Sequence, residues 1–369
     1  MDSENSLATA EAHFGKLLNS RTIPALGGFR MLAVFSVVLA HAGYSGLFSA
    51  RHGVSGFFVL SGFLITWLLL QEYETHKTVS LKHFFLRRAY RIFPAYYAFL
   101  AFSISMDLWR GNSDIEPLIW PGVFYLVNYY NAIEGHASAS IAHAWSLAVE
   151  EQFYLIWPVL FLFLVRRGQA WLVAGLLGLI LLVASWRSIA FSVLDLGPSY
   201  VYNAFDTRFD NLAVGCLLAV LLKRQLFQRI GTVLAWWAWT PLVTLALLHL
   251  SRQVSSAHYA YGPAFTLDAV LMAVLLVQLI QLGQGRWWCW LNHRVAVYFG
   301  AVSYPLYLYH IWGLQIGRKL TAALPVTFQL GTGIMVGLLM AMASYHLIER
   351  PLLEKKVRYT PSLSRDTPS

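Results

Sequence analysis

Charged side chains are scarce in this sequence of 369 residues. Asp, Glu, Lys and Arg make up 12% of it, whereas soluble domains carry about 25%. Hydrophobic residues reach 57% and gather in runs close to the roughly 20 residues that a transmembrane helix needs. The scarcity of charge excludes an ordinary soluble globular protein. An outer-membrane barrel is disfavoured as well, because its strands would be short and alternating. The composition therefore predicts an all-α, polytopic membrane protein.

Cysteine is almost absent, and no cleavable leader is apparent. The only two cysteines, Cys216 and Cys289, are far apart in the chain. Their spacing predicts neither a disulfide framework nor a metal site. The first 22 residues are polar and acidic in part, which does not match a signal peptide. We expect them to form a cytoplasmic tail.

Apolar runs that are long enough to span a membrane occur ten times. They cover residues 29–47, 53–71, 92–109, 145–165, 170–187, 205–222, 231–250, 263–282, 296–316 and 325–347. A further apolar segment, residues 117–130, is too short to cross without tilting. The sequence thus predicts about ten transmembrane helices and one re-entrant or surface-lying segment.

Basic residues indicate the orientation of these helices. The net charge of +9 would suggest a nucleic-acid partner in a soluble protein. Here it is better explained by basic loops that remain on the cytoplasmic side of an anionic bilayer. Most of these residues become cytoplasmic if both termini are inside and residues 117–130 do not cross. They are Lys16, Arg21, Lys77, Lys82, Arg87, Arg88, Arg91, Arg166, Arg167, Lys223, Arg224, Arg229, Arg286, Arg294, Lys355, Lys356 and Arg358. Arg318 and Lys319 are the exception, in a loop on the outer side.

The chain is expected to hold one membrane domain, residues 23–356. Residues 357–369 are polar with Pro and Ser, so we expect a disordered cytoplasmic tail. No internal repeat and no appended soluble domain are apparent, and nothing in the sequence indicates an oligomeric state.

Arg30 and His41 stand out in the first apolar run. Ionisable side chains are costly in hydrocarbon, and those found there usually face protein or a water-filled cavity and serve a function. Their spacing is close to three helical turns, which puts both on one face, roughly 16 Å apart. We expect Arg30 near the cytoplasmic surface and His41 deep in the membrane. The plainer interpretation of His41 is a hydrogen-bonded core histidine.

A basic and aromatic segment, residues 84–94, precedes the third run. Arg87, Arg88 and Arg91 lie close together on a helix of this sequence. Guanidinium groups clustered at a membrane surface suit phosphate binding. The alternative is an ordinary positive-inside anchor.

The segment 143–158 carries polar residues at a helical repeat. Ser146, Glu150 and Tyr154 recur every four residues and share one face. The adjacent carboxyls Glu150 and Glu151 are hard to explain as structure alone, since each would neutralise or seek a cation or an imidazole. A Glu that orients His41 would make its imidazole a competent general base.

Two further segments complete the polar motifs. Arg208 and Asp210 occur in the sequence TRFD, residues 207–210, at the start of the sixth run. They form an interfacial ion pair or contact a polar acceptor. Tyr307 and His310 belong to the sequence SYPLYLYH in the ninth run. They are ordinary membrane aromatics or line a pore.

These motifs in this order resemble the membrane acyltransferase family 3, bacterial enzymes that O-acylate sugars and related acceptors. The resemblance covers roughly residues 22–355 and includes GFFVLSGFLI and WSLAVEEQFY. It implies a multi-pass protein of the bacterial inner membrane, an acyl-CoA donor (usually acetyl-CoA) and no bound cofactor. The implied acceptor is a hydroxyl of a carbohydrate such as an O-antigen, an exopolysaccharide or a nodulation oligosaccharide. A macrolide or another small molecule is the alternative acceptor.

The resemblance implies roles for the polar residues. Arg30, Arg87, Arg88 and Arg91 would bind the donor. His41, oriented by Glu150 or less favourably by Glu151, would deprotonate the acceptor hydroxyl, with an acetyl-His intermediate left open. Acceptor-contacting or pore-lining residues would be Ser146, Tyr154, Arg208, Asp210, Tyr307 and His310. Without an appended domain, direct transfer is expected rather than relay in cis.

Two other classes of protein remain open from the residues. A proton-coupled secondary transporter would also use an intramembrane His and carboxylates. It does not explain the cytoplasmic arginines, and no repeat pair is visible. A structural scaffold leaves Glu150 and His41 unexplained.

Overall fold

Helices make up almost all of the computed structural model, which describes residues 12–18, 20, 23 and 25–356. No strand occurs in these ranges. The long helices are α2 (Leu26–Leu39), α3 (Ala50–His76), α4 (Leu81–Trp109), α7 (Trp145–Val165), α8 (Gln169–Ser192), α10 (Phe205–Leu222), α12 (Thr240–Gln253), α14 (Ala264–Leu282), α15 (Arg294–Leu320) and α16 (Val326–Ser344). The all-α expectation is confirmed.

Seven helical segments of the described chain are long and apolar enough to cross a membrane. They are Leu26–Tyr44, Ala50–His76, Leu81–Trp109, Ala142–Val165, Gln169–Ser192, Ala264–Leu282 and Val326–Leu353. Helices α10, α12 and α15 overlap three further expected spans, but they do not meet the same criterion of length and hydropathy. The expected span 231–250 is not one helix, because it is divided between α11 (Gln225–Leu234) and α12. Pro241 stands in the first turn of α12, where proline is favoured at a helix start.

Short helices lie between the long ones and after the last of them. They are α5 (Ile119–Val123), α6 (Val127–Glu134), α9 (Gly197–Asn203), α13 (Ala257–Tyr261) and α17 (Arg350–Lys356). Segment 117–130 is thus broken into α5 and the start of α6, each far shorter than a span. Residues 12–18 are helical and Phe14 is fully buried, so part of the expected N-terminal tail packs on the bundle. The rest of that tail, and residues 357–369, lie outside the described residues.

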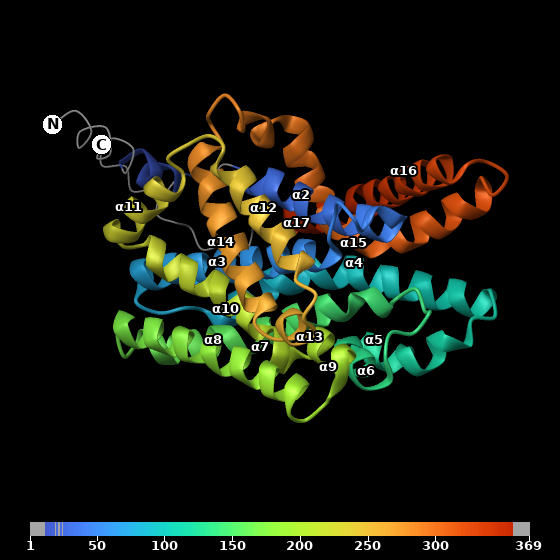
Figure 1. Cartoon of the computed structure of the whole chain (residues 1–369), viewed down its shortest axis with the longest axis horizontal. Coiled ribbons are helices and arrows are strands. Elements are labelled where there is room, and N and C mark those ends of the chain that lie inside the picture. The colour runs from blue at the N-terminus through green and yellow to red at the C-terminus, as the bar shows by residue number, and fades with distance from the viewer. Residues whose placement is uncertain (1–11, 19, 21–22, 24, 357–369) are drawn as a thin grey trace.

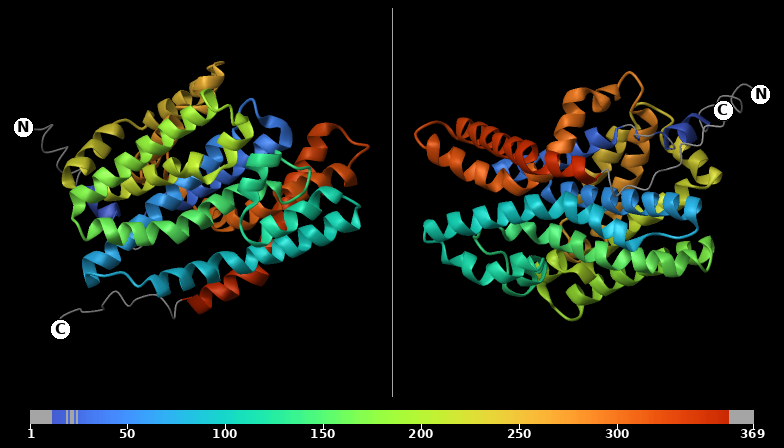
Figure 2. Two further views of the ribbon diagram at one scale, coloured as in Figure 1. Left: turned by 90° about the horizontal axis from the view of Figure 1, so that it is seen from below. Right: turned by 180° about the vertical axis from the view of Figure 1, so that it is seen from behind.

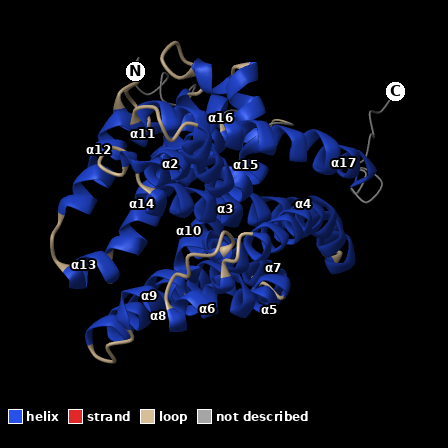
Figure 3. Cartoon of the chain, turned by 90° about the vertical axis from the view of Figure 1, so that its right-hand side faces the viewer, coloured by secondary structure: helices blue, strands red, loops and turns tan. Residues whose placement is uncertain are grey.

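Helix α3 lies at the centre of the bundle, next to α10 (Figure 3). Glycines bring these two helices into close contact. A Cβ on Gly62 would lie 2.0 Å from the Leu212 carbonyl oxygen, and one on Gly215 would lie 2.0 Å from that of Val59. Small residues at such positions let helix backbones approach closely.

The remaining helices pack around this centre. Helices α2, α14 and α7 contact α3, while α8 contacts α10. Helices α15 and α16 form a hairpin that projects at one end of the molecule (Figure 1). At the same end lies the end of α4, and the two views of Figure 2 agree on this arrangement. The hairpin and α4 therefore frame one end of the bundle.

Candidate active site

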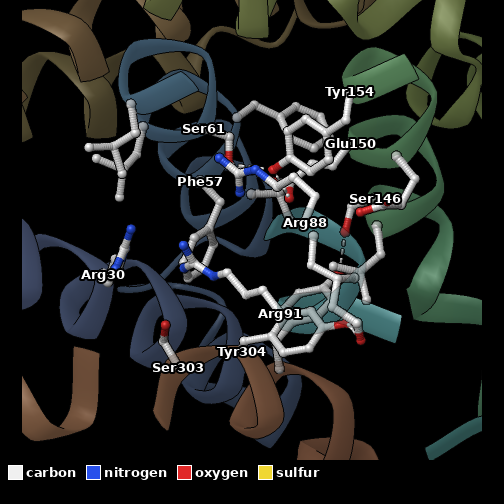
Figure 4. Close-up of a pocket in the computed structure, with 18 of the residues that line it drawn as sticks. Arg30, Phe57, Ser61, Arg88, Arg91, Ser146, Glu150, Tyr154, Ser303 and Tyr304 are labelled. Carbon is white, nitrogen blue, oxygen red and sulfur yellow. Dashed lines mark hydrogen bonds between the residues drawn. The ribbon is translucent and has the colours of Figure 1, made fainter. Parts of the chain in front are cut away.

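A cavity of about 240 Å³ gathers the arginines of two helices. Arg30 comes from α2, and Arg88 and Arg91 come from α4. Figure 4 shows all three side chains directed into the same space. We call this the arginine cavity; its other polar lining residues are Ser61, Ser146, Glu150, Glu151, Tyr154, Ser303, Tyr304 and Tyr307. Three guanidiniums outnumber two carboxyls here, so the cavity suits an anionic group.

Arg87, expected to bind the donor, does not line this cavity. Its Nη2 lies 3.2 Å from Oε2 of Glu72 on α3. Arg88 instead lies over the ring of Tyr154, with its guanidinium carbon 4.7 Å from the ring centroid. Arg87 and Arg91 are only about 40° apart around the helix, so the ion pair with Glu72, rather than helical phase, keeps Arg87 out of the cavity.

Glu150 does not orient His41, contrary to the expectation from the sequence. Its Oε1 accepts a hydrogen bond from the Ser61 hydroxyl at 3.1 Å, and its Oε2 accepts one from Tyr154 at 3.0 Å. Both partners line the arginine cavity. Glu151 lines the same cavity. The carboxyl pair is therefore part of the cationic site, and Tyr154 belongs there too rather than with the acceptor.

His41 lines a second cavity, of about 330 Å³. Helix α2 ends at Leu39, and a wider π-helical turn, Ala40–Tyr44, follows. Gly43, with φ 107°, allows this turn to end. The turn leaves His41 exposed to the cavity instead of deep among packed helices. We call this the histidine cavity; it is lined by Val37, His41, Ala50, Val54, His136, Ala137, Ser138, Ala139, Ala142, His143, Trp145, Tyr202, Tyr307, Ile311 and Gln315.

His310 is the hydrogen-bond partner of His41, at 3.0 Å between His41 Nδ1 and His310 Nε2. Nδ1 of His310 lies 2.7 Å from the Tyr307 carbonyl oxygen. A carbonyl only accepts, so this Nδ1 carries the hydrogen, and Nε2 of neutral His310 is an acceptor. His41 must then donate from Nδ1. Neutral His41 is left with a lone pair on Nε2, the arrangement that a general base requires.

The two cavities share two lining residues, Val54 and Tyr307. The Tyr307 hydroxyl donates to the His143 carbonyl at 2.8 Å. Its single hydrogen is thereby used, so the Ser146 hydroxyl, 2.7 Å away, donates to Tyr307. Figure 4 shows Ser146 with this hydrogen bond at the edge of the arginine cavity. Tyr307 is therefore a hydrogen-bonded partition between the cationic site and His41.

Arg208 and Asp210, expected to line the path of an acceptor, line neither cavity. Both are fully buried. They do not pair with each other, because Asp210 accepts from Arg187 at 2.9 Å. The Arg208 guanidinium carbon lies 4.1 Å from the ring centroid of Phe265. This motif holds α8, α10 and α14 together behind the histidine cavity.

Several site residues were not identified from the sequence. His143 and His136 line the histidine cavity, and the His143 ring centroid lies 5.0 Å from that of His310. Burial lowers the pKa of His136, in the loop after α6, below its usual value. His143 lies two residues before the WSLAVEEQFY segment, and this position was the available signal. For Arg187, the available signal was a charged residue at the end of the apolar run 170–187.

Known proteins resemble this chain along most of its length. The model of an acyltransferase domain, the acyltransferase family 3 domain, matches residues 23–345. Peptidoglycan O-acetyltransferase OatA of Listeria monocytogenes is 29% identical over 78% of this chain and 49% of its own length. YrhL of Bacillus subtilis, provisionally named a peptidoglycan O-acetyltransferase, is 28% identical over 92% of this chain and 56% of its own length. A provisionally named O-acetyltransferase of Staphylococcus aureus strain COL is 28% identical over 94% of this chain and 59% of its own length.

This chain spans about half the length of the curated relatives it matches. No solved structure matches it. The family match covers far more than half of the sequence, from Arg30 and His41 through the SYPLYLYH segment. On this ground the chain belongs to the acyltransferase family 3.

Proposed function

We propose that this protein transfers an acyl group, acetyl in the first instance, from acyl-CoA to a hydroxyl of a carbohydrate acceptor. The observation that carries this proposal is the meeting of the arginine cavity and the histidine cavity at Tyr307. One cavity suits a phosphate-bearing donor, and the other presents a free imidazole nitrogen. The relatives named as O-acetyltransferases support the same activity, and two names specify peptidoglycan.

The donor would enter with its phosphates at Arg30, Arg88 and Arg91. Arginine binds phosphate oxygens through paired, charge-assisted hydrogen bonds. Acyl-CoA is a cytoplasmic metabolite, so the arginine cavity would open to the cytoplasm of a bacterium, as the basic loops of the sequence indicate. The thioester would then extend past Ser146 towards Tyr307 and His41.

The chemical step follows from the state of His41. Its Nε2 takes the proton of the acceptor hydroxyl as the hydroxyl oxygen attacks the thioester carbonyl carbon. A carbon–oxygen bond forms, and the carbon–sulfur bond breaks. The departing thiolate of CoA receives the proton from the His41 imidazolium. The Nδ1 hydrogen bond to His310 is kept throughout, so His310 positions His41.

The experiment is acyl transfer by the purified full chain in detergent micelles, with labelled acetyl-CoA and peptidoglycan fragments as the first acceptor. His41→Ala should lower transfer by about 10²–10⁴-fold, the usual contribution of a general base. Binding of acetyl-CoA should be retained, because His41 lies outside the arginine cavity. Full activity of His41→Ala would overturn the proposal. Uptake of a solute by vesicles without any acyl transfer would instead support the proton-coupled carrier.

A further inference from the structure

A third hollow lies beside the histidine cavity, where α4 and α15 end. Trp109 and Arg110 form the end of α4, and Gln315, Arg318 and Lys319 belong to the last turns of α15. These five residues line a hollow of about 780 Å³, which we call the basic groove. All of them except Gln315 are exposed. The basic groove is therefore open to a ligand.

The cations of the basic groove have no acidic partner. Among the described residues, no ion pair involves Arg110, Arg318 or Lys319. Two acidic residues nearby in sequence are bonded elsewhere: Asp107 accepts from the backbone N–H and the hydroxyl of Ser140. Asp114 accepts from the backbone N–H of Ser138. The three cations of the basic groove are thus without an ion-pair partner among the described residues.

Arg110 is held in place before any ligand arrives. Its Nη1 donates to Oε1 of Gln315 at 2.9 Å. Its guanidinium carbon lies 4.3 Å from the ring centroid of Trp312, a cation–π contact. A guanidinium has five N–H donors, so this arrangement leaves others for a carboxylate or phosphate. An arginine that is already ordered loses less entropy on binding.

The basic groove adjoins the histidine cavity. Gln315 lines both of them, and Ile311, one turn earlier on α15, lines the histidine cavity. With a rise of 1.5 Å per residue, Gln315 lies roughly 8 Å along the helix from His310. A chain molecule that occupies the groove would therefore place its neighbouring unit beside His41.

Arg318 and Lys319 also depart from the charge bias of the loops, and Arg110 lies at the same end of the molecule. Cations are normally concentrated on the cytoplasmic side, and here three of them gather at the other end, beside the acceptor cavity. We propose that the basic groove binds an anionic glycan: it pairs with carboxylate or phosphate groups of the acceptor chain while a neighbouring sugar enters the histidine cavity. This inference rests on the proposed transferase function.

Trp109 fits the same ligand. Its side chain is 78% exposed, so a flat apolar surface stands next to the cations. The C–H face of a sugar ring can pack on such a surface while its acidic group meets an arginine. Interfacial tryptophans and cations also contact lipid headgroups. The experiment must therefore distinguish binding of an anionic glycan from binding of anionic lipid.

The test measures binding of two matched probes to the full chain in neutral detergent. One probe is hexagalacturonate, and the other is the same hexasaccharide with every carboxylate reduced to an alcohol. Wild type should bind the acidic probe roughly tenfold more tightly, the effect of about two partly exposed charge contacts. Arg318→Ala combined with Lys319→Ala should abolish this preference. Arg318→Gln with Lys319→Gln, which keeps side-chain bulk, should do the same.

Arg166→Ala is the matched control, since Arg166 is an exposed cation just after α7, remote from the basic groove. It should leave the preference unchanged. Equal binding of the two probes by wild type would overturn the inference. A double variant that keeps the preference, or that loses only its affinity for vesicles of anionic phospholipid, would overturn it as well.

A measurement of acetyl-CoA binding distinguishes failure of the basic-groove inference from failure of the proposed transferase function. Wild type that binds acetyl-CoA but does not distinguish the two hexasaccharides refutes the basic groove alone. Wild type that neither binds nor uses acetyl-CoA refutes the transferase itself. Unchanged acetyl-CoA binding also shows that the double variant is folded.

Discussion

At the scale of single residues, His310 takes the place that the sequence suggested for Glu150. A carboxylate partner would stabilise the His41 imidazolium by opposite charge. A neutral imidazole partner fixes the tautomer of His41 without adding charge next to the acyl group. This assignment follows from two hydrogen bonds, one to the Tyr307 carbonyl and one to His41.

His310→Leu should lower kcat by about 100-fold, because His41 loses the acceptor that keeps the hydrogen on Nδ1. The KM for acetyl-CoA should remain unchanged, since His310 does not line the arginine cavity. His310→Gln, which presents an oxygen acceptor to His41, should recover part of kcat. Steady-state kinetics on the three proteins check this, and equal rates for Leu and Gln variants would refute a positioning role.

Arg88 and Arg87 provide a matched pair for the donor site. Arg88→Ala removes a cation of the arginine cavity and should weaken acetyl-CoA binding by roughly tenfold or more, the value of a charge-assisted hydrogen bond. Arg87→Ala removes a cation that pairs with Glu72 outside the cavity and should change affinity by less than about twofold. Isothermal titration with acetyl-CoA distinguishes them. Equal losses of acetyl-CoA affinity in the two variants would show that both arginines attract the donor only through the overall positive charge of this region.

Some of this site could be predicted from periodicity alone. Helical spacing places Arg88 and Arg91 on one face and Arg30 on the side of α2 that also bears His41. The partner of His41 could not be predicted, because it depends on how far α7 and α15 are shifted along their axes relative to α2. That shift places Glu150 beside Ser61 and puts His310 beside His41.

At the scale of helices, the contact between α3 and α10 depends on two glycines. One of them, Gly62, belongs to the GFFVLSGFLI segment. The partner helix was not predictable, because Gly215 is far away in the chain. The division of span 231–250 was missed for a different reason: the uninterrupted hydropathy of residues 233–243 outweighed the helix-start signal of Pro241.

Gly215→Ala should destabilise the protein by about 1–3 kcal/mol, the cost of overpacking a tight contact. Its Cβ would lie 2.0 Å from the Val59 carbonyl oxygen, so α3 and α10 must separate. Gly178→Ala on α8 is the control, since nothing lies within 4 Å of its Cβ. That variant should keep or slightly raise stability, because alanine favours helix. Thermal unfolding in detergent micelles measures both, and identical melting temperatures would contradict the packing argument.

At the scale of the whole molecule, the proposed reaction requires each cavity to open to its own side of the membrane. Cys289, on the segment between α14 and α15, is exposed, and Cys216 is buried. From the distribution of basic loops we expect Cys289 to lie on the cytoplasmic side. A membrane-impermeant maleimide should therefore label one thiol per chain in inverted vesicles and none in right-side-out vesicles. Labelling in right-side-out vesicles would show that the protein has the opposite orientation, with the arginine cavity open to the outside.

The partition at Tyr307 also has an electrical consequence. Where both cavities fill with water, the voltage across the bilayer falls mainly over the thin layer formed by Val54 and Tyr307. Moving one net charge through that layer involves about 2.3 kcal/mol per 100 mV. The reaction exchanges an acyl group for a proton between a thiol and a hydroxyl, while the phosphates of CoA stay with the arginines. No net charge crosses, so acylation on the far side can proceed without drawing on the membrane potential or opposing it.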